Sequence, residues 1–151
     1  MSPQERAAKV RELLARCASG VLCTQSERME GFPYGSVAPF SLDAYGAPFF
    51  FLSGLAVHTK NLQANPKASL LVNEEAGGLD GGRVNLFGEV QPVADEALIA
   101  DLRARYLARH PEAEQWIDFG DFAFYRMEVA NIYWVGGFGA MGWVPVDAYQ
   151  S

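Results

Sequence analysis

Residues 51–62 read FLSGLAVHTKNL, and this stretch contains the end of one strand and the start of a helix. Residues 48–53 form an apolar run of strand length, and residues 55–65 have the composition of a short helix that Pro66 ends. A further strand is predicted directly afterwards, over residues 68–73. The stretch therefore predicts a strand, a short helix and a second strand with almost no linker between them.

Short strands separated by turn residues extend from this stretch in both directions. They are predicted over residues 20–25, 34–42, 83–93, 123–130 and 132–135, with a hairpin turn at residues 43–46 and a flexible loop at residues 75–82. A parallel sheet needs a crossover helix after nearly every strand, and the sequence lacks those helices. We therefore expect a mainly β (α+β) fold, an antiparallel barrel of six to seven strands with flanking helices.

Two further segments have helical periodicity. Ser2, Pro3 and Glu5 form a capping pattern at the start of the N-terminal helix, which we expect Ser19-Gly20 to stop. The second helix is predicted over residues 94–110, with an apolar face that includes Leu102. These helices flank the predicted barrel.

The composition is that of an ordinary globular domain. The 151 residues carry a formal net charge of −6, and half of them are hydrophobic. Because no repeat or long linker divides the sequence, residues 1–151 are expected to form one domain. The acidic balance argues against a nucleic-acid partner. No apolar run is long enough for a membrane span, and the N-terminus lacks a secretory pattern, so we expect a cytoplasmic protein.

The cysteines and histidines do not form a metal-binding pattern. Cys17 and Cys23 lie six positions apart with no neighbouring histidine, and we expect two small buried thiols in a reducing compartment. His110 precedes Pro111 at a helix end, where its positive charge suits the helix dipole. No metal site is predicted.

The junction at residues 51–62 is a candidate anion site. A helix N-terminus presents unpaired backbone N–H groups, and nearby hydroxyl and ammonium groups add charge-assisted hydrogen bonds to a phosphate. The side chains gathered there are Ser53, His58, Thr59, Lys60 and Asn61. The alternative is a simple hydroxyl cap of the helix beside a solvated lysine.

Two strands carry residues suited to a ligand. Gly35 and Ser36 are small enough for a flat ligand to approach the backbone, although a bulge that bends a barrel strand explains them equally well. Arg83, Asn85 and Phe87 share one face of the long strand. They either line a pocket or form the solvated side of an edge strand.

Aromatic side chains surround the GGFG turn at residues 136–139. They are Trp134, Phe138 and Trp143. Aromatic rings in this place either cover a ring system or plug the mouth of the barrel. The sequence leaves both alternatives open.

The order of several blocks resembles one known superfamily. The blocks are PYGSVAPF (33–40), FLSGLAVHTKNL (51–62), NPKASLLV (65–72), GRVNLFGEV (82–90), DFAFYRMEV (121–129) and GGFG (136–139). Together they resemble the FMN-binding split-barrel superfamily related to pyridoxamine 5′-phosphate oxidase, and within it the haem-utilisation branch of bacterial haem-degrading proteins.

This resemblance implies a homodimer of split barrels that binds FMN where the subunits meet. The phosphate position of the family corresponds here to Ser53, His58, Thr59, Lys60 and Asn61. The strand along the isoalloxazine ring corresponds to Tyr34, Gly35 and Ser36. Arg83 corresponds to a polar contact of the flavin, and Trp143 to a contact added by the partner subunit.

Two departures from the family narrow the expected function. No histidine follows His110, whereas haem-degrading relatives bind iron through a histidine of a further C-terminal segment. No arginine or lysine follows Arg126, so the substrate motif of pyridoxal-forming oxidases is not visible.

Three functions remain after these departures. The leading hypothesis is an FMN-dependent oxidoreductase, without an assigned catalytic residue. The alternative is a haem- or flavin-binding protein without turnover, for which His58 is a candidate ligand. A structural dimer with an empty cleft is the third.

Overall fold

The computed structural model describes residues 1–74, 81–137 and 139–151. Its strands are β1 (Ser19–Gln25), β2 (Pro33–Pro39), β3 (Ser41–Leu42), β4 (Pro48–Ser53), β5 (Lys67–Asn73), β6 (Arg83–Pro92), β7 (Phe122–Val135) and β8 (Met141–Val144). Its helices are α1 (Pro3–Arg16), α2 (Val57–Ala64), α3 (Glu96–Arg109), the 3₁₀ helix η2 (Pro111–Gln115) and α4 (Val146–Gln150). Residues 75–80 of the predicted loop, and Phe138 of the predicted aromatic group, lie outside the described residues.

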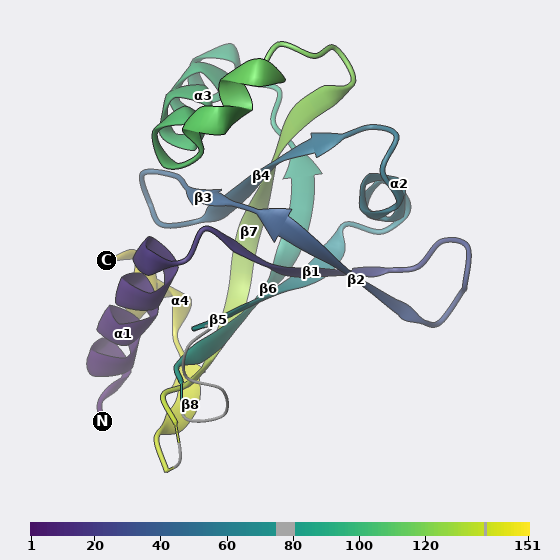
Figure 1. Ribbon diagram of the computed structural model, residues 1–151. Helices are drawn as coiled ribbons and strands as arrows, with labels where there is room; N and C mark the ends of the chain where they lie inside the picture. Colours follow the sequence, from purple (N-terminus) through teal and green to yellow (C-terminus); the bar gives the residue numbers. More distant parts are fainter. Residues whose placement is uncertain (75–80, 138) are drawn as a thin grey trace.

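The strands form one antiparallel sheet that curls round on itself. Its order is β2-β1-β5-β6-β7-β4-β3, and β8 pairs with β7. β2 and β3 are two halves of one bent segment separated by Phe40. Because β2 pairs with β1 and β3 pairs with β4, this segment connects both ends of the sheet (Figure 1). The predicted mainly β, antiparallel split barrel with flanking helices is confirmed.

The N-terminal helix packs into the main core. α1 begins with the predicted capping box, in which the Ser2 hydroxyl and the Glu5 carboxylate accept each other's backbone N–H. Its buried face includes Leu13, which joins the barrel core. The helix ends at Arg16, so the predicted stop at Ser19-Gly20 is wrong: these residues begin β1.

A second, smaller core lies between α3 and the strands β4 and β7. Leu102 and Tyr106 of α3 pack there with Phe49 and Phe124. Figure 1 shows α3 at one end of the curled sheet and β8 at the opposite end. Among the described residues, no helix is long and apolar enough to cross a membrane.

The C-terminal part differs from the sequence expectation. β7 is one continuous strand, where the sequence predicts two. Its pairing with β6 shifts register between Phe87 and Gly88, and this bulge does not interrupt the strand. β8 and α4 were not predicted at all. α4 is fixed by long-range contacts: Arg11 donates to the carbonyl groups of Ala148 and Tyr149. Such contacts leave no local sequence pattern.

Candidate functional site

The residues predicted to contact a cofactor fall into two groups in the structure. The first group, which we call the α2 corner, lies where α2 packs against β1 and β2. It consists of Tyr34, Ser36, Ser53, His58, Thr59, Lys60 and Asn61. The second group lies on the outer face, the side of the sheet opposite the buried core, and consists of Gly35, Arg83 and Trp143.

Two of the predicted phosphate ligands are fully buried and hydrogen-bonded within the chain. Thr59 is 0 % exposed, and its hydroxyl donates to the carbonyl of Ser53 at 2.6 Å. Asn61 is 1 % exposed, donates to Thr24 Oγ1 at 3.1 Å and accepts from the backbone N–H of Glu27 at 3.0 Å. These side chains fix the shape of the α2 corner and tie it to the hairpin between β1 and β2.

A third predicted ligand is held by a carboxylate. The Ser53 hydroxyl donates to Asp121 Oδ2 at 3.0 Å and accepts from the backbone N–H of Leu55 at 3.2 Å. A phosphate at this hydroxyl would lie beside the Asp121 carboxylate, and like charges at short range repel. Lys60 is exposed, without an ion-pair partner among the described residues. The α2 corner therefore offers an anion fewer groups than the sequence suggested.

His58 is the most distinctive side chain of the α2 corner. Its Nδ1 lies 3.1 Å from Ser36 Oγ, so the structure brings together these two predicted residues from α2 and β2. Burial lowers the pKa of His58 below its ordinary value, which favours a neutral imidazole. Its Nε2 has no hydrogen-bond partner among the described residues. The imidazole is thus held at one nitrogen and available at the other.

Exposed apolar side chains surround this corner. Tyr34 is two residues before Ser36 on β2 and shares its face. Leu55 lies in the connection between β4 and α2, Val57 begins α2 directly before His58, and both are exposed. A half-buried imidazole among exposed apolar groups suits a ligand that is itself largely apolar.

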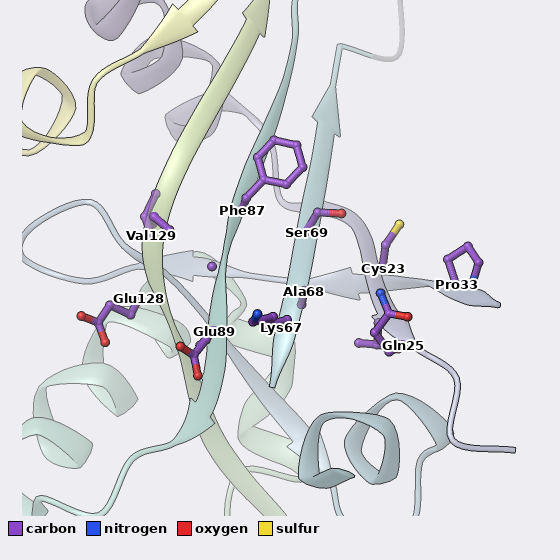
Figure 2. A pocket seen from close by; sticks show the side chains of 13 residues that line it. Cys23, Gln25, Pro33, Lys67, Ala68, Ser69, Phe87, Glu89, Glu128 and Val129 are labelled. Carbon is purple, nitrogen blue, oxygen red and sulfur yellow. The ribbon is translucent and has the colours of Figure 1, made fainter. Parts of the chain in front are cut away.

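A groove of about 640 Å³ lies on the outer face, across β1, β5, β6 and β7. Figure 2 shows its floor and rim, with the short side chains of Cys23 and Ser69 on neighbouring strands and Phe87 standing beside them. The strand register puts Gly35, Cys23, Ser69 and Phe87 in one row across β2, β1, β5 and β6. Because three of these residues are small, the row forms a shallow depression next to an aromatic ring.

A charged row borders the groove. Lys67 lies directly opposite Glu89, and Glu89 lies directly opposite Glu128, on the adjacent strands β5, β6 and β7. Like charges directly opposite each other destabilise a sheet. Lys67 offsets part of that repulsion, and the row presents both signs of charge to solvent.

Aromatic rings extend the outer face beyond the groove. The Trp143 ring centroid lies 4.9 Å from that of Tyr133 and 6.1 Å from that of Phe87. Trp143 is 55 % exposed, whereas Trp134 is buried in the barrel core. The two tryptophans near the GGFG turn therefore act differently: Trp134 fills the barrel, and Trp143 remains available to a ligand or a partner.

Arg83 lies apart from the α2 corner within one chain. It begins β6 opposite Val135, four residues from Phe87, which is roughly 13 Å along a strand. β6 is also three strands away from β2, which corresponds to roughly 14 Å across the sheet. In a single chain, Arg83 and Gly35 therefore do not meet.

The sequence interpretation missed most of the groove. Cys23 is expected as a buried thiol, but both cysteines are half-buried, and Cys23 lines the groove. Lys67, Ser69 and Glu128 were not singled out either. Their outward alternation in strands was the available signal, but the sequence alone did not show which strands were neighbours.

His110 is occupied within the fold. It is 5 % exposed, and its Nε2 donates to the carbonyl of Phe40 at 2.7 Å. Its ring also packs against Tyr106. Within the described parts of the chain, no three side chains of the His, Cys, Asp and Glu types gather as a metal site.

Replacing Asn61 by alanine is expected to destabilise the fold by about 1–3 kcal/mol, because Thr24 Oγ1 and the Glu27 N–H lose a buried partner. Unfolding in urea measures this change. Lys60→Ala is the matched control, since Lys60 is exposed and one residue away; its free energy of unfolding should stay within about 0.5 kcal/mol of the wild type. Equal stability of Asn61→Ala and Lys60→Ala would refute the structural role of Asn61.

Comparisons with known proteins agree with this architecture. A family model described as the β-barrel of CREG matches residues 1–151. The chloroplastic haem oxygenase HOZ of Arabidopsis thaliana is 42% identical over 137 residues, which cover 91% of this chain and 41% of that protein. Human CREG1 is 28% identical over 169 residues, covering 100% of this chain and 76% of that protein.

Solved structures include a haem-binding protein from Mycobacterium smegmatis. It superimposes with a TM-score of 0.86 and 31% sequence identity, over 99% of this chain and 60% of that chain. The present chain thus spans 41% of the length of HOZ and 60% of the mycobacterial protein.

Proposed function

The chain belongs to the CREG β-barrel family, within the split-barrel superfamily related to pyridoxamine 5′-phosphate oxidase, and on this premise we propose that it binds haem. The haem would lie at the α2 corner of one copy and be covered by the outer face of a second copy. Two relatives with 42% and 31% identity are named as a haem oxygenase and a haem-binding protein.

The observation that carries the proposal is the environment of His58. Haem needs an apolar surface for its macrocycle and commonly a nitrogen or sulfur ligand for its iron. The α2 corner offers exposed Tyr34, Leu55 and Val57, and an imidazole with one nitrogen that has no hydrogen-bond partner in the described parts of the chain. Lys60 in the first turn of α2 supplies a positive charge for a propionate. These residues fit haem.

A second copy of the chain is the proposed cover of the outer face. Val37, Phe87, Met141 and Trp143 are exposed there, and such a group of apolar side chains is typical of an interface. The row that contains Lys67, Glu89 and Glu128 has both signs of charge, so a copy related by two-fold symmetry can pair opposite charges across the contact. The homodimer expected from the sequence is therefore part of the proposal.

Replacing Trp143 by glutamate is expected to shift the protein towards the monomer, because a charge would then be buried in the contact. Sedimentation velocity at micromolar concentration measures the mass. Phe119→Glu is the matched control, because Phe119 has the same exposed fraction of 55 % but lies outside the outer face. A dimer in Trp143→Glu, or a monomeric wild type, would contradict this part of the proposal.

FMN is the second candidate, favoured by Lys60 and the backbone N–H groups of the first turn of α2. In this arrangement Lys60 and His58 face the phosphate, and Tyr34, Gly35 and Ser36 lie along the ring system. Arg83 and Trp143 reach the flavin from the second copy. An FMN-bound protein would be a candidate oxidoreductase, because the flavin supplies the redox chemistry.

Parallel absorbance titrations with haem and with FMN separate the candidates. We expect saturable haem binding with a shifted Soret band, and no comparable change in the flavin spectrum. Saturable FMN binding without haem binding would replace the proposal by the flavoprotein hypothesis. The cytoplasmic location stays a prediction, and the relative HOZ is a chloroplastic protein.

A further inference from the structure

We propose that His58 Nε2 is the iron ligand of the bound haem, and that Ser36 is a positioning residue that keeps this nitrogen unprotonated. This inference rests on the proposed function, because it assigns the ligand of the same site.

The chain contains two histidines. Among the described residues, only His58 has a ring nitrogen on a partly exposed side chain without a hydrogen-bond partner. His110 is buried, and its Nε2 already donates to the carbonyl of Phe40. Removing His110 from that contact would leave a buried carbonyl without its donor. His58 has Nδ1 beside Ser36, whereas its Nε2 has no partner within the described residues. His58 is therefore the histidine that can bind iron without breaking the fold.

The Ser36 hydroxyl decides which nitrogen of His58 carries the proton. A hydroxyl has one proton to donate, and we assign it to the carbonyl of Leu22, which lies 3.5 Å from Ser36 Oγ. With this assignment, Ser36 Oγ accepts from His58 Nδ1, 3.1 Å away. The neutral imidazole consequently carries its proton on Nδ1 and has a lone pair on Nε2.

This arrangement is the one that metal-binding histidines require. A ligating imidazole donates its second N–H to an oxygen of the protein, which fixes both the tautomer and the ring orientation. Ser36 lies on β2 in register with Leu22 of β1, so the sheet holds the accepting oxygen in place. Tyr34, on the same face of β2, and Val57, next to His58, provide apolar contacts beside the iron position.

The tautomer is measured first, on the protein without haem, by long-range ¹H–¹⁵N NMR of the imidazole. We expect a proton on Nδ1 of His58 in the wild type. Ser36→Ala removes the acceptor and should shift the population towards the Nε2–H form, whereas Ser36→Thr retains a hydroxyl and should keep the wild-type tautomer. An Nε2–H imidazole in the wild type would overturn the role of Ser36, whatever haem does.

The ligand is then tested with haem as the probe. Resonance Raman spectra of the reduced wild type should show an iron–histidine stretch, which His58→Ala should lose and added imidazole should restore. Ser36→Ala should weaken haem binding by roughly 10- to 100-fold. This is the usual effect of removing the group that accepts the second N–H of a metal-binding histidine. His58→Gln serves as a second variant if His58→Ala does not fold.

The outcomes distinguish this inference from the proposed function. Haem bound to His58→Ala with an unchanged iron–histidine stretch would overturn the inference and leave haem binding standing. A wild type that binds no haem would overturn the proposed function itself, and with it the ligand assignment.

Discussion

Replacing Gly88 by alanine is expected to destabilise the fold strongly. An added Cβ would lie 2.1 Å from the carbonyl oxygen of Glu128 and 2.9 Å from Met127 Cγ. The oxygen belongs to the backbone of β7, so the two central strands must move apart for the methyl group to fit. Overpacking typically costs 1–3 kcal/mol, and a clash with backbone should reach at least about 3 kcal/mol. The total free energy of unfolding of a typical domain is only about 5–15 kcal/mol.

Unfolding in urea, followed by circular dichroism, measures the effect of Gly88→Ala. Gly120→Ala is the matched control, because a Cβ at Gly120 meets nothing within 4 Å. Its free energy of unfolding should stay within about 0.5 kcal/mol of the wild type. If Gly88→Ala were as stable as Gly120→Ala, the described pairing of β6 with β7 at the register shift would be wrong.

Replacing Asp43 by alanine is the second change with a large expected effect. The Asp43 side chain is buried, and its Oδ1 accepts from the backbone N–H groups of Tyr45 and Ala47, each at 2.9 Å. Its Oδ2 accepts from Arg126 Nε at 2.6 Å. Removing one partner of a buried ion pair typically costs about 3–5 kcal/mol, and two backbone donors lose their acceptor as well. We expect a loss in that range, measured by urea unfolding.

The control for Asp43→Ala is Asp101→Ala. Asp101 also accepts from an arginine Nε, that of Arg105 at 2.8 Å, but both side chains are largely exposed. An exposed helical pair of this spacing contributes about 0.3–0.5 kcal/mol. A loss below 1 kcal/mol for Asp43→Ala would show that the turn after β3 does not depend on its contact with β7.

Much of the fold follows from the sequence because its signals are local. The apolar run before Ser53 predicts β4 with its observed bounds, and the capping pattern of Ser2 and Glu5 predicts the start of α1. The antiparallel barrel follows from the missing crossover helices. Membership of the split-barrel superfamily is confirmed, since the family model described as the β-barrel of CREG matches residues 1–151.

The remaining features depend on contacts between distant segments. α4 is fixed by the Tyr149 hydroxyl, which donates to the carbonyl of Gly46 at 2.6 Å, and burial raises the pKa of Tyr149 to about 12, so the hydroxyl stays protonated. Five residues without helical periodicity do not predict such a helix. The groove likewise depends on the order of the strands, which places Cys23 beside Ser69.

The sequence predicts where the candidate site lies, but it does not predict the hydrogen bonds of the site. The sequence placed His58 at the start of α2 and Ser36 on a strand, and the structure brings them to 3.1 Å. It did not show that Thr59 and Asn61 point into the fold, because hydroxyl and amide side chains suit a buried network and a phosphate equally well. FMN, the homodimer and the site residues stay predictions until a ligand is measured.

The most direct test of haem binding is the ligand content of the protein as cells produce it. The chain would be expressed with riboflavin and a haem precursor in the medium, purified, and its extracted haem and FMN quantified by mass spectrometry against the chain concentration. We predict a molar ratio of haem to binding sites close to one, with only traces of FMN. An equimolar amount of FMN without haem would contradict the central claim and establish that the protein is a flavoprotein instead.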